Sequence, residues 1–324
     1  MTKILGIGNA LVDLLIKIED DSFLNTLNLP KGSMQLVDAD TKEQIAEKSK
    51  HLSKSMASGG SAANTIHGIA RLGTETAFVG TVGKDEIGEF FSNDLEKSKI
   101  KPLLNYSGNP SGLATTFISK DGERTFGTFL GAAIELNDKS LNEDYFKEYD
   151  ILHIEGYLVQ NHQLIEQALK LAKANGMKVS IDMASYNVVE DNLDFLKEMV
   201  EKYVDIVFAN EEEAKAFTGM EPEAALDKIA GMADIAIVKV GKEGSFIKSG
   251  DEKVKIGVIE TTVTDTTGAG DLYASGFLHG IANNKGFEFS GKLGSLLAGT
   301  VIQNIGAKIS DESWEKIYSE IKTF

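Results

Sequence analysis

Short apolar runs alternate with longer amphipathic stretches along most of this chain, and this alternation restricts the fold more than any other feature. Several runs are apolar on both faces, which is typical of strands buried in a parallel sheet. Repeated β-α-β units predict an α/β fold with helices on both faces of a mostly parallel sheet. The predicted strands are Ile4–Gly8, Ala77–Val82, Ile151–Glu155, Lys178–Asp182, Ile206–Ala209 and Ile235–Val240; the predicted helices are Asp85–Lys99, His162–Ala174, Leu193–Tyr203, Asp271–Asn283, Ser290–Asn304 and Asp311–Ile321.

Two segments depart from this pattern. Asp13–Ile18 and Leu113–Leu130 have the features of exposed strands, and the second contains Asp121-Gly122 between two alternating runs, a strong hairpin signal. Antiparallel strands inserted into a parallel core must pack elsewhere, so we expect them to form a small β-sheet lid. The predicted division places 10–35 and 108–131 in the lid, and 1–9, 36–107 and 132–324 in the α/β core.

Composition excludes several classes of protein. With 33 basic and 49 acidic residues the net charge is −16, which argues against a nucleic-acid partner. The chain has no cysteine, so neither a disulfide scaffold nor a cysteine-ligated zinc site can form. No apolar run is long enough to span a membrane, and the apolar N-terminal segment lacks a signal-peptide cleavage pattern. We therefore expect a soluble, cytoplasmic protein with no membrane partner.

The most informative segment is Asp265-Thr266-Thr267-Gly268-Ala269-Gly270-Asp271, which precedes a predicted helix. Two glycines separated by one residue let backbone N–H groups converge, and the start of the helix adds unpaired donors and the positive end of its dipole. Such a loop suits a phosphate or the charge that develops during phosphoryl transfer. Asp271 could accept the proton of an attacking hydroxyl. The alternative is that Asp271 only caps the helix.

A second glycine-rich segment, Gly59-Gly60-Ser61-Ala62-Ala63-Asn64, also precedes a predicted helix, which ends near Arg71. The glycine pair permits close approach of a ligand, and Asn64 would face whatever the glycines contact. The alternative is a helix packed tightly on the sheet through its small residues.

Together the two segments resemble the signatures of the ribokinase-like family, also called the PfkB carbohydrate kinases. The D-T-x-G-A-G-D pattern is matched in full, and G-G-x-x-x-N followed by L-G lies about 200 residues before it, in the family's order. The resemblance implies a ribokinase-like three-layer α/β/α sandwich with a β-sheet lid. It further implies that Asp271 is the catalytic base, that Gly268, Ala269 and Gly270 form the anion hole, and that Gly59, Gly60 and Asn64 bind substrate hydroxyls.

The same resemblance implies roles at the ends of three strands. Asn9 and Asp13 would bind sugar hydroxyls, since a carboxylate can accept hydrogen bonds from two hydroxyl groups. Asn210 and Glu213 match an N-x-x-E motif that positions Mg²⁺ and the phosphates, usually through water; the alternative is an acidic helix start favoured by the dipole. Lys239, Gly241 and Gly244 match a nucleotide-contacting T-x-G-x-x-G stretch, in which Lys239 replaces the family's threonine. The alternative for the two glycines is a tight turn between strands.

The chain has only two arginines, Arg71 and Arg124. In the resembled family a lid-proximal arginine approaches the ATP phosphates, and a guanidinium suits that task because it stays charged and offers forked donors. We therefore predict that Arg124 faces the phosphates, whereas Arg71 is structural. Asp265 and Thr267 match positions at which family members bind a monovalent cation such as K⁺.

These patterns predict an ATP- and Mg²⁺-dependent kinase that phosphorylates a hydroxymethyl group. The opening Gly-Asn-Ala-Leu-Val-Asp resembles adenosine-kinase-like members of the family, which favours the adenosine 5′-hydroxyl as acceptor. A free-sugar kinase acting on ribose or fructose and a non-catalytic sensor of sugars or nucleotides remain alternatives, as do monomer and homodimer. Phe117, Phe126 and Tyr157 are candidates to stack on a base, or else packing residues. Neither a Walker motif nor a complete dinucleotide fingerprint is present.

Overall fold

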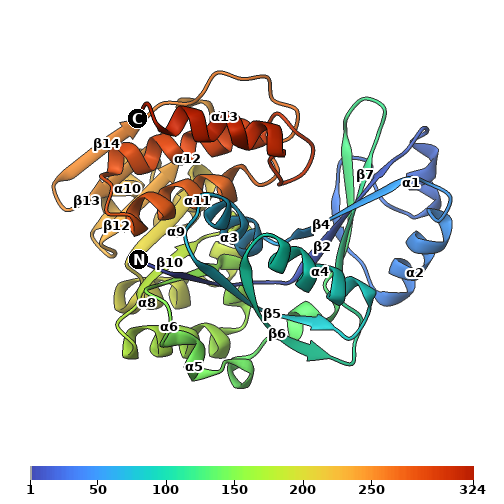
Figure 1. Cartoon of the computed structure of the whole chain (residues 1–324), viewed down its shortest axis with the longest axis horizontal. Coiled ribbons are helices and arrows are strands. Elements are labelled where there is room, and N and C mark those ends of the chain that lie inside the picture. The colour runs from blue at the N-terminus through green and yellow to red at the C-terminus, as the bar shows by residue number, and fades with distance from the viewer. Residues whose placement is uncertain (1) are drawn as a thin grey trace.

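A nine-stranded sheet forms the centre of the computed structural model, which describes residues 2–324 (Figure 1). Its order is β14-β13-β12-β11-β10-β9-β1-β5-β6. The strands from β12 to β6 run parallel, whereas β13 and β14 form an antiparallel hairpin at one edge. Their bounds are β1 Ile4–Ile7, β5 Thr76–Gly83, β6 Ile100–Ser107, β9 Ile151–Glu155, β10 Lys178–Asp182, β11 Ile206–Asn210, β12 Ile235–Lys239, β13 Ser245–Ser249 and β14 Glu252–Ile256.

Helices cover both faces of this sheet, as the sequence predicts. Successive residues of a strand belong to two separate hydrophobic clusters, one on each face of the sheet. In β11, Phe208 packs toward one helical layer and Val207 toward the other. The first layer holds α3 Ser61–Arg71, α4 Glu86–Lys97, α11 Ala269–Ala282 and α12 Phe287–Val301, with α13 Asp311–Ile321 packed on α12; the second holds α5 Glu143–Phe146, α6 His162–Ala174, α7 Tyr186–Asp191, α8 Leu193–Tyr203, α9 Glu211–Thr218 and α10 Pro222–Ala230. The three-layer α/β/α sandwich is confirmed.

A second, five-stranded sheet stands to one side of the core and forms the lid (Figure 1). The predicted hairpin is present: β7 and β8 pair antiparallel around the turn at Asp121-Gly122. The outer face of the sheet packs on two helices through Leu24, Leu29 and Ile45. The lid elements are β2 Leu11–Lys17, α1 Ser22–Thr26, β3 Met34–Leu36, α2 Ala39–Lys48, β4 Lys54–Gly59, β7 Gly112–Ile118 and β8 Arg124–Phe129, in the sheet order β3-β8-β7-β2-β4.

Two details of the predicted lid are wrong. Strand β4 belongs to the lid sheet, where it pairs with β2, although the prediction assigned 36–107 to the core. Its sequence, Lys-Ser-Met-Ala-Ser-Gly, has no apolar alternation, so only pairing with β2 identifies it as a strand. Strand β7 is buried along its whole length rather than exposed, because β2 and β8 flank it and the lid helices cover its outer face.

The site lies where the chain order of the core sheet reverses. From β1 the chain proceeds outward through β5 and β6, and it then returns to place β9 on the other side of β1. Ligands of open α/β sheets bind at such a switch point, outside the carboxyl ends of the strands. Strand β2 follows β1 directly and β4 leads directly into α3, so both strands join the lid to this point. Within residues 2–324, no helix has the length and apolar character needed to cross a membrane.

Candidate active site

A cavity of about 980 Å³ opens at the carboxyl edge of the core sheet, between the starts of α3, α9 and α11. It gathers residues that are more than 200 positions apart in the sequence. Asn9, Gly59, Arg124 and Asp265 do not line it. The predicted site residues that do are Asp13, Gly60, Asn64, Asn210, Glu213, Lys239, Gly241, Gly244, Thr267, Gly268, Ala269, Gly270 and Asp271.

The Gly268–Gly270 loop forms the first turn of α11. Gly268 is the N-cap with φ +76°, a left-handed conformation that favours glycine, and a Cβ added there would lie 2.5 Å from the Cβ of Ala307. Asp265 fixes the loop from below, since its carboxylate oxygens each accept a backbone hydrogen bond of 2.6 Å, from Thr267 and Gly306. The N–H groups at the start of α11 therefore face the cavity without a side-chain cap.

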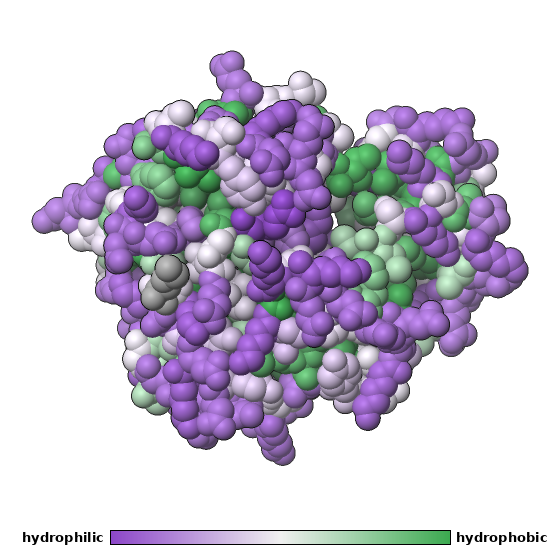
Figure 2. Space-filling view, in the orientation of Figure 1, coloured by the Kyte–Doolittle hydropathy of each residue, from purple (hydrophilic) through white to green (hydrophobic). Residues whose placement is uncertain are grey.

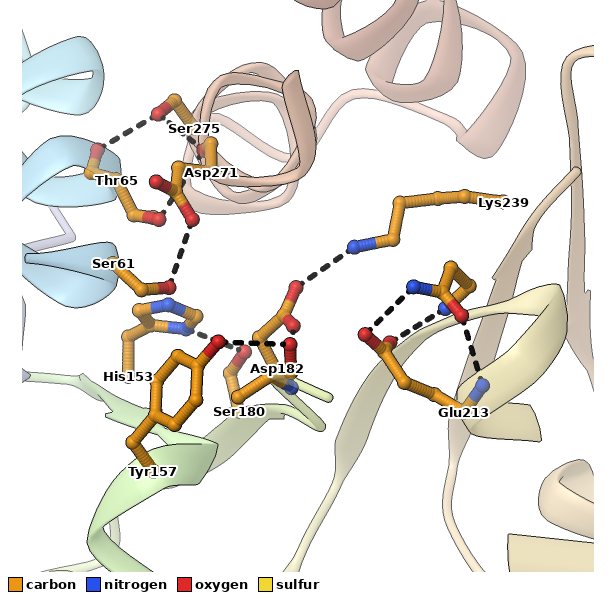
Figure 3. Close-up of polar contacts among 12 residues, drawn as sticks. Ser61, Thr65, His153, Tyr157, Ser180, Asp182, Glu213, Lys239, Asp271 and Ser275 are labelled. Atoms are coloured by element: carbon orange, nitrogen blue, oxygen red, sulfur yellow. Dashed lines mark hydrogen bonds and ion pairs between the residues drawn. The ribbon is translucent and has the colours of Figure 1, made fainter. Parts of the chain in front are cut away.

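Asp271 is the third residue of α11, so the hypothesis that it serves as the helix cap is wrong. Its carboxylate accepts a hydrogen bond from Ser61 Oγ at 2.8 Å (Figure 3). It accepts another from Asn64 Nδ2 at 3.0 Å. Burial raises the pKa of Asp271 to about 6, against the effect of these two donors. The Oδ1 atom of Asn64 is buried without a hydrogen-bond partner.

The glycine pair before α3 leaves space for the side chain of Asp13 and the backbone of Asn9. A Cβ on Gly59 would lie 2.4 Å from a carboxylate oxygen of Asp13, and one on Gly60, where φ is +95°, would lie 2.2 Å from the carbonyl oxygen of Asn9. Asn9 itself turns away from the cavity and donates to Glu155 at 2.5 Å. Because Glu155 also accepts from the backbone N–H of Ala62, Asn9 and Glu155 fix the start of α3.

Asp13 projects from lid strand β2 into the cavity wall. Burial raises its pKa to about 6, and the ammonium of Lys308 offsets only part of that effect. Lys308 is half-buried beneath the lid, where it donates to Ser58 Oγ at 3.3 Å. Burial lowers the pKa of Lys308 to about 8, against the attraction of Asp94 and Asp13. The Lys308 ammonium is therefore near enough to act on the Asp13 carboxylate, although it does not line the cavity.

Asn210 and Glu213 form a capping box at the start of α9. Asn210 Oδ1 accepts from the Glu213 N–H at 2.8 Å, while both oxygens of Glu213 accept from Asn210, each at 2.7 Å. Burial and the nearby Asp182 carboxylate raise the pKa of Glu213 to about 7. A carboxylate engaged in this way can reach a metal ion through water more readily than directly.

Lys239 ends strand β12, and its Nζ donates to Asp182 Oδ2 at 2.9 Å (Figure 3). The turn that follows is the tight turn between strands that the sequence offers as the alternative for the two glycines. Gly244 has φ +95°, and a Cβ there would lie 1.9 Å from the carbonyl oxygen of Ile256, so this turn requires glycine.

Arg124 lies elsewhere than predicted. Its guanidinium reaches from lid strand β8 to the core, pairs with the buried carboxylate of Asp265 and donates to Thr267 Oγ1 at 2.6 Å. The two side chains predicted to hold a monovalent cation therefore hold this guanidinium, and Arg124 does not line the cavity. Arg71, predicted to be structural, donates to Asp311 on α13 at 2.7 Å.

The three aromatic candidates differ in position. Phe117 is fully buried on the outer face of the lid, where its ring lies 5.5 Å from that of Phe23, so a role in base stacking is wrong. Phe126 lies on the opposite, core-facing side, because strand register places it on the same face as Asp13. Tyr157 lines the cavity.

Four residues of the site had no signal strong enough to find them in the sequence. Asp182 and Glu155 each end a predicted strand, and Glu155 ends the strand that pairs with β1. Both therefore lie at the carboxyl edge of the sheet, where a site is expected, but neither belongs to a recognisable motif. Ser61 lies inside the G-G-x-x-x-N pattern at a variable position. Lys308 follows helix α12 in an irregular segment, and only the tertiary fold brings it beneath the lid.

Comparison with known proteins matches residues 31–314 to the pfkB family carbohydrate kinases. This chain belongs to that family. Similar solved structures include the adenosine kinase from Sinorhizobium meliloti, 34% identical with TM-score 0.86 over 98% of this chain and 99% of that one. Another is a probable sugar kinase protein from Rhizobium etli, 33% identical with TM-score 0.86 over 98% of both chains. The 5-dehydro-2-deoxygluconokinase of Bacillus subtilis is 29% identical and aligns with 75% of this chain and 80% of its own length.

As a PfkB kinase, the protein is a phosphotransferase that acts on an alcohol group, and ATP is the donor expected for the family. The cavity fits such a donor. The loop at Gly268 presents uncapped N–H groups, and the glycine turn at Gly244 lets backbone approach closely. Among the described residues no group of three or more His, Cys, Asp or Glu side chains forms a metal site. A sparse protein shell is what Mg²⁺ uses when substrate phosphates and water supply its other ligands.

Proposed function

We propose that this PfkB kinase transfers the γ-phosphate of ATP to the 5′-hydroxyl of adenosine, with Asp271 as the catalytic base. The observation that supports the chemistry most strongly is the pairing of two features within one helical turn. Asp271 holds a buried carboxylate next to the uncapped N–H groups that follow Gly268. A proton acceptor and an anion-stabilising loop thus face the same volume.

In this mechanism the acceptor hydroxyl lies against the Asp271 carboxylate, which lines the cavity. Its proton passes to the Asp271 carboxylate while its oxygen attacks the γ-phosphorus in line, and the bond from that phosphorus to the β,γ-bridging oxygen breaks. The Gly268–Gly270 backbone binds the charge on the transferring oxygens. Ser61 and Asn64 keep the carboxylate oriented before the proton moves.

Mg²⁺ bound to the phosphates would offset their negative charge. The residues that suit it are Asp182, which ends β10, and Glu213, in the first turn of the helix that follows the neighbouring strand β11, and we propose that they contact its water shell. Because Arg124 occupies Asp265 and Thr267, we propose no monovalent cation there.

The core-facing side of the lid supports adenosine as the acceptor. Strand register places Leu15, Phe126, Met34 and Leu36 on the same face as Asp13. Met34 and Leu36 are 60% and 66% exposed, and Figure 2 shows hydrophobic surface on the lid beside the core. An apolar face next to hydroxyl-binding groups suits a purine attached to a ribose better than a free sugar.

One observation favours a second acceptor class. Lys308 is a half-buried ammonium whose charge acts on Asp13, and an acceptor that carries a carboxylate could bind it. This would suit a sugar acid, the class named for the Bacillus subtilis relative.

A panel of acceptors tests the proposal. The purified protein with Mg²⁺ and ATP is assayed for ADP formation with adenosine, inosine, ribose, fructose and 5-dehydro-2-deoxygluconate, and thermal shift measures the binding of each compound. We expect kcat/KM for adenosine to exceed that for each free sugar and the sugar acid by about 100-fold or more. A larger kcat/KM for the sugar acid would replace adenosine by the second class. No ADP formation with any compound would favour a non-catalytic sensor.

A further inference from the structure

The cavity contains one buried cation that the proposed mechanism has not used. Lys239 Nζ lies 2.9 Å from Asp182 Oδ2, and the two side chains are 16% and 8% exposed. Burial lowers the pKa of Lys239, but the carboxylates of Asp182 and Glu213 outweigh that effect and raise it above its ordinary value. The side chain is therefore a charged ammonium at neutral pH.

This ammonium lies against the anion-binding loop. A Cβ added to Gly270 would be 3.0 Å from Lys239 Nζ, so the charge is next to the backbone that would bind the transferring phosphate. The other cations are less well placed. Arg124 is held by Asp265 outside the cavity, and among the described residues that line the cavity only Lys242 carries a further positive charge, on an exposed side chain.

Acidic groups surround the place where the phosphates would bind. Asp182, Glu213 and Asp271 all face Lys239, and all three carboxylates act on its pKa. Asp182 is held in place by the backbone N–H of Ala184 at 3.1 Å, and Ala184 has a left-handed φ of +64°. Without Lys239 this acidic cluster would repel the γ-phosphate.

We propose that Lys239 is a catalytic residue that binds the γ-phosphate of ATP and is held in position by Asp182 until ATP arrives. The inference rests on the proposed function, since it assumes that phosphoryl transfer occurs beside Asp271. Lys239 keeps its proton throughout: the hydroxyl proton goes to Asp271, and the ammonium only balances charge on the transferring oxygens. The lysine that replaces the family's threonine thus supplies the cation that Arg124 does not.

Binding of nucleotides without an acceptor tests this directly. Isothermal titration compares ADP with the non-hydrolysable ATP analogue AMP-PNP, both with Mg²⁺, in the wild type and in Lys239→Met. If Lys239 binds the γ-phosphate, the variant should lose about tenfold or more in affinity for AMP-PNP and much less for ADP. Lys242→Met is the matched control, because Lys242 lines the same cavity but is exposed, and it should change neither affinity appreciably.

A double variant separates phosphate binding from mere neutralisation of Asp182. Lys239→Met leaves a buried carboxylate without its partner and could impair folding, whereas Asp182→Asn combined with Lys239→Met removes both charges together. The reference is Asp182→Asn alone, which carries any loss that comes from the Mg²⁺ contact proposed for Asp182. Relative to that reference, we expect the double variant to fold, to show the same selective loss of AMP-PNP affinity and to turn over about 100-fold more slowly or worse. Wild-type AMP-PNP affinity and turnover in the double variant would overturn the proposal and leave Lys239 a structural partner of Asp182. Because the binding comparison needs no acceptor, failure of adenosine as substrate would not affect it.

Discussion

Replacement of Asp271 by Asn is expected to lower kcat by about 10²–10⁴-fold, the usual contribution of a general base. Asn keeps the shape of the side chain and can still contact Ser61 and Asn64, but it cannot accept the hydroxyl proton. The Kd of adenosine and the Kd of AMP-PNP should stay within a few-fold of the wild-type values. Steady-state kinetics and titration calorimetry measure these quantities separately.

Glu212→Gln is the matched control, since Glu212 is an exposed carboxylate that lines the same cavity. It should leave kcat nearly unchanged. Stability provides a second check. Burial disfavours the charged form of Asp271 and raises its pKa, so the ionised group opposes folding above pH 6, and the neutral variant should melt no lower than the wild type at pH 7. If Asp271→Asn turned over nearly as fast as the wild type, another group would have to accept the proton.

Protonation of the Asp271 carboxylate should determine how kcat/KM falls at acid pH. With a pKa of about 6, Asp271 is ionised at pH 7.5 and takes up a proton as the pH falls through 6. Because the base must be ionised to act, kcat/KM should fall at least tenfold per unit below pH 6.

Replacement of Asp13 by Asn is expected to lower kcat/KM for the acceptor by about 100-fold, with little change in the KM of ATP. A carboxylate accepts hydrogen bonds from two hydroxyls, whereas an amide accepts from one and directs its N–H donors at the other. Loss of charge-assisted hydrogen bonds of this kind costs about 1.5–3 kcal/mol each. Initial rates measured over a grid of adenosine and ATP concentrations separate the two constants.

Asp94→Asn provides the control for charge. Asp94 also attracts the Lys308 ammonium, but its carboxylate accepts from the Ser58 N–H and does not line the cavity. Its replacement should leave the acceptor constants within about threefold of wild type. Equal losses in the two variants would indicate that both act through Lys308 rather than through substrate hydroxyls.

The sequence predicted the core because its strands and helices follow simple periodicities. Ile151–Glu155 and His162–Ala174 match the observed elements at both ends. The lid was harder, because a short polar strand such as β4 acquires its structure from pairing with β2 and not from its own residues. Phe117 shows the same limit: strand alternation gives two faces but does not say which of them meets the core.

In the site, the glycine loop and Asp271 were predicted because their chemistry is local in sequence. The glycines before α3 have a further reason that spacing does not reveal, since Gly59 makes room for Asp13. The ion pair of Arg124 is not predictable from the sequence, because its partner, Asp265, lies 141 positions away and only the tertiary fold brings them together. Side chains that depend on such long-range pairs cannot be placed from spacing alone.

Phosphorus NMR of the product formed from ATP and adenosine tests the central claim most directly. Transfer to the 5′-hydroxyl predicts a phosphomonoester signal split into a triplet by the two 5′ protons, formed in equal amount to ADP and absent with Asp271→Asn. A doublet would indicate transfer to a secondary hydroxyl of the ribose. Release of inorganic phosphate without any nucleotide product, or a phosphomonoester formed only with a sugar or sugar acid, would contradict the assignment of adenosine as the acceptor.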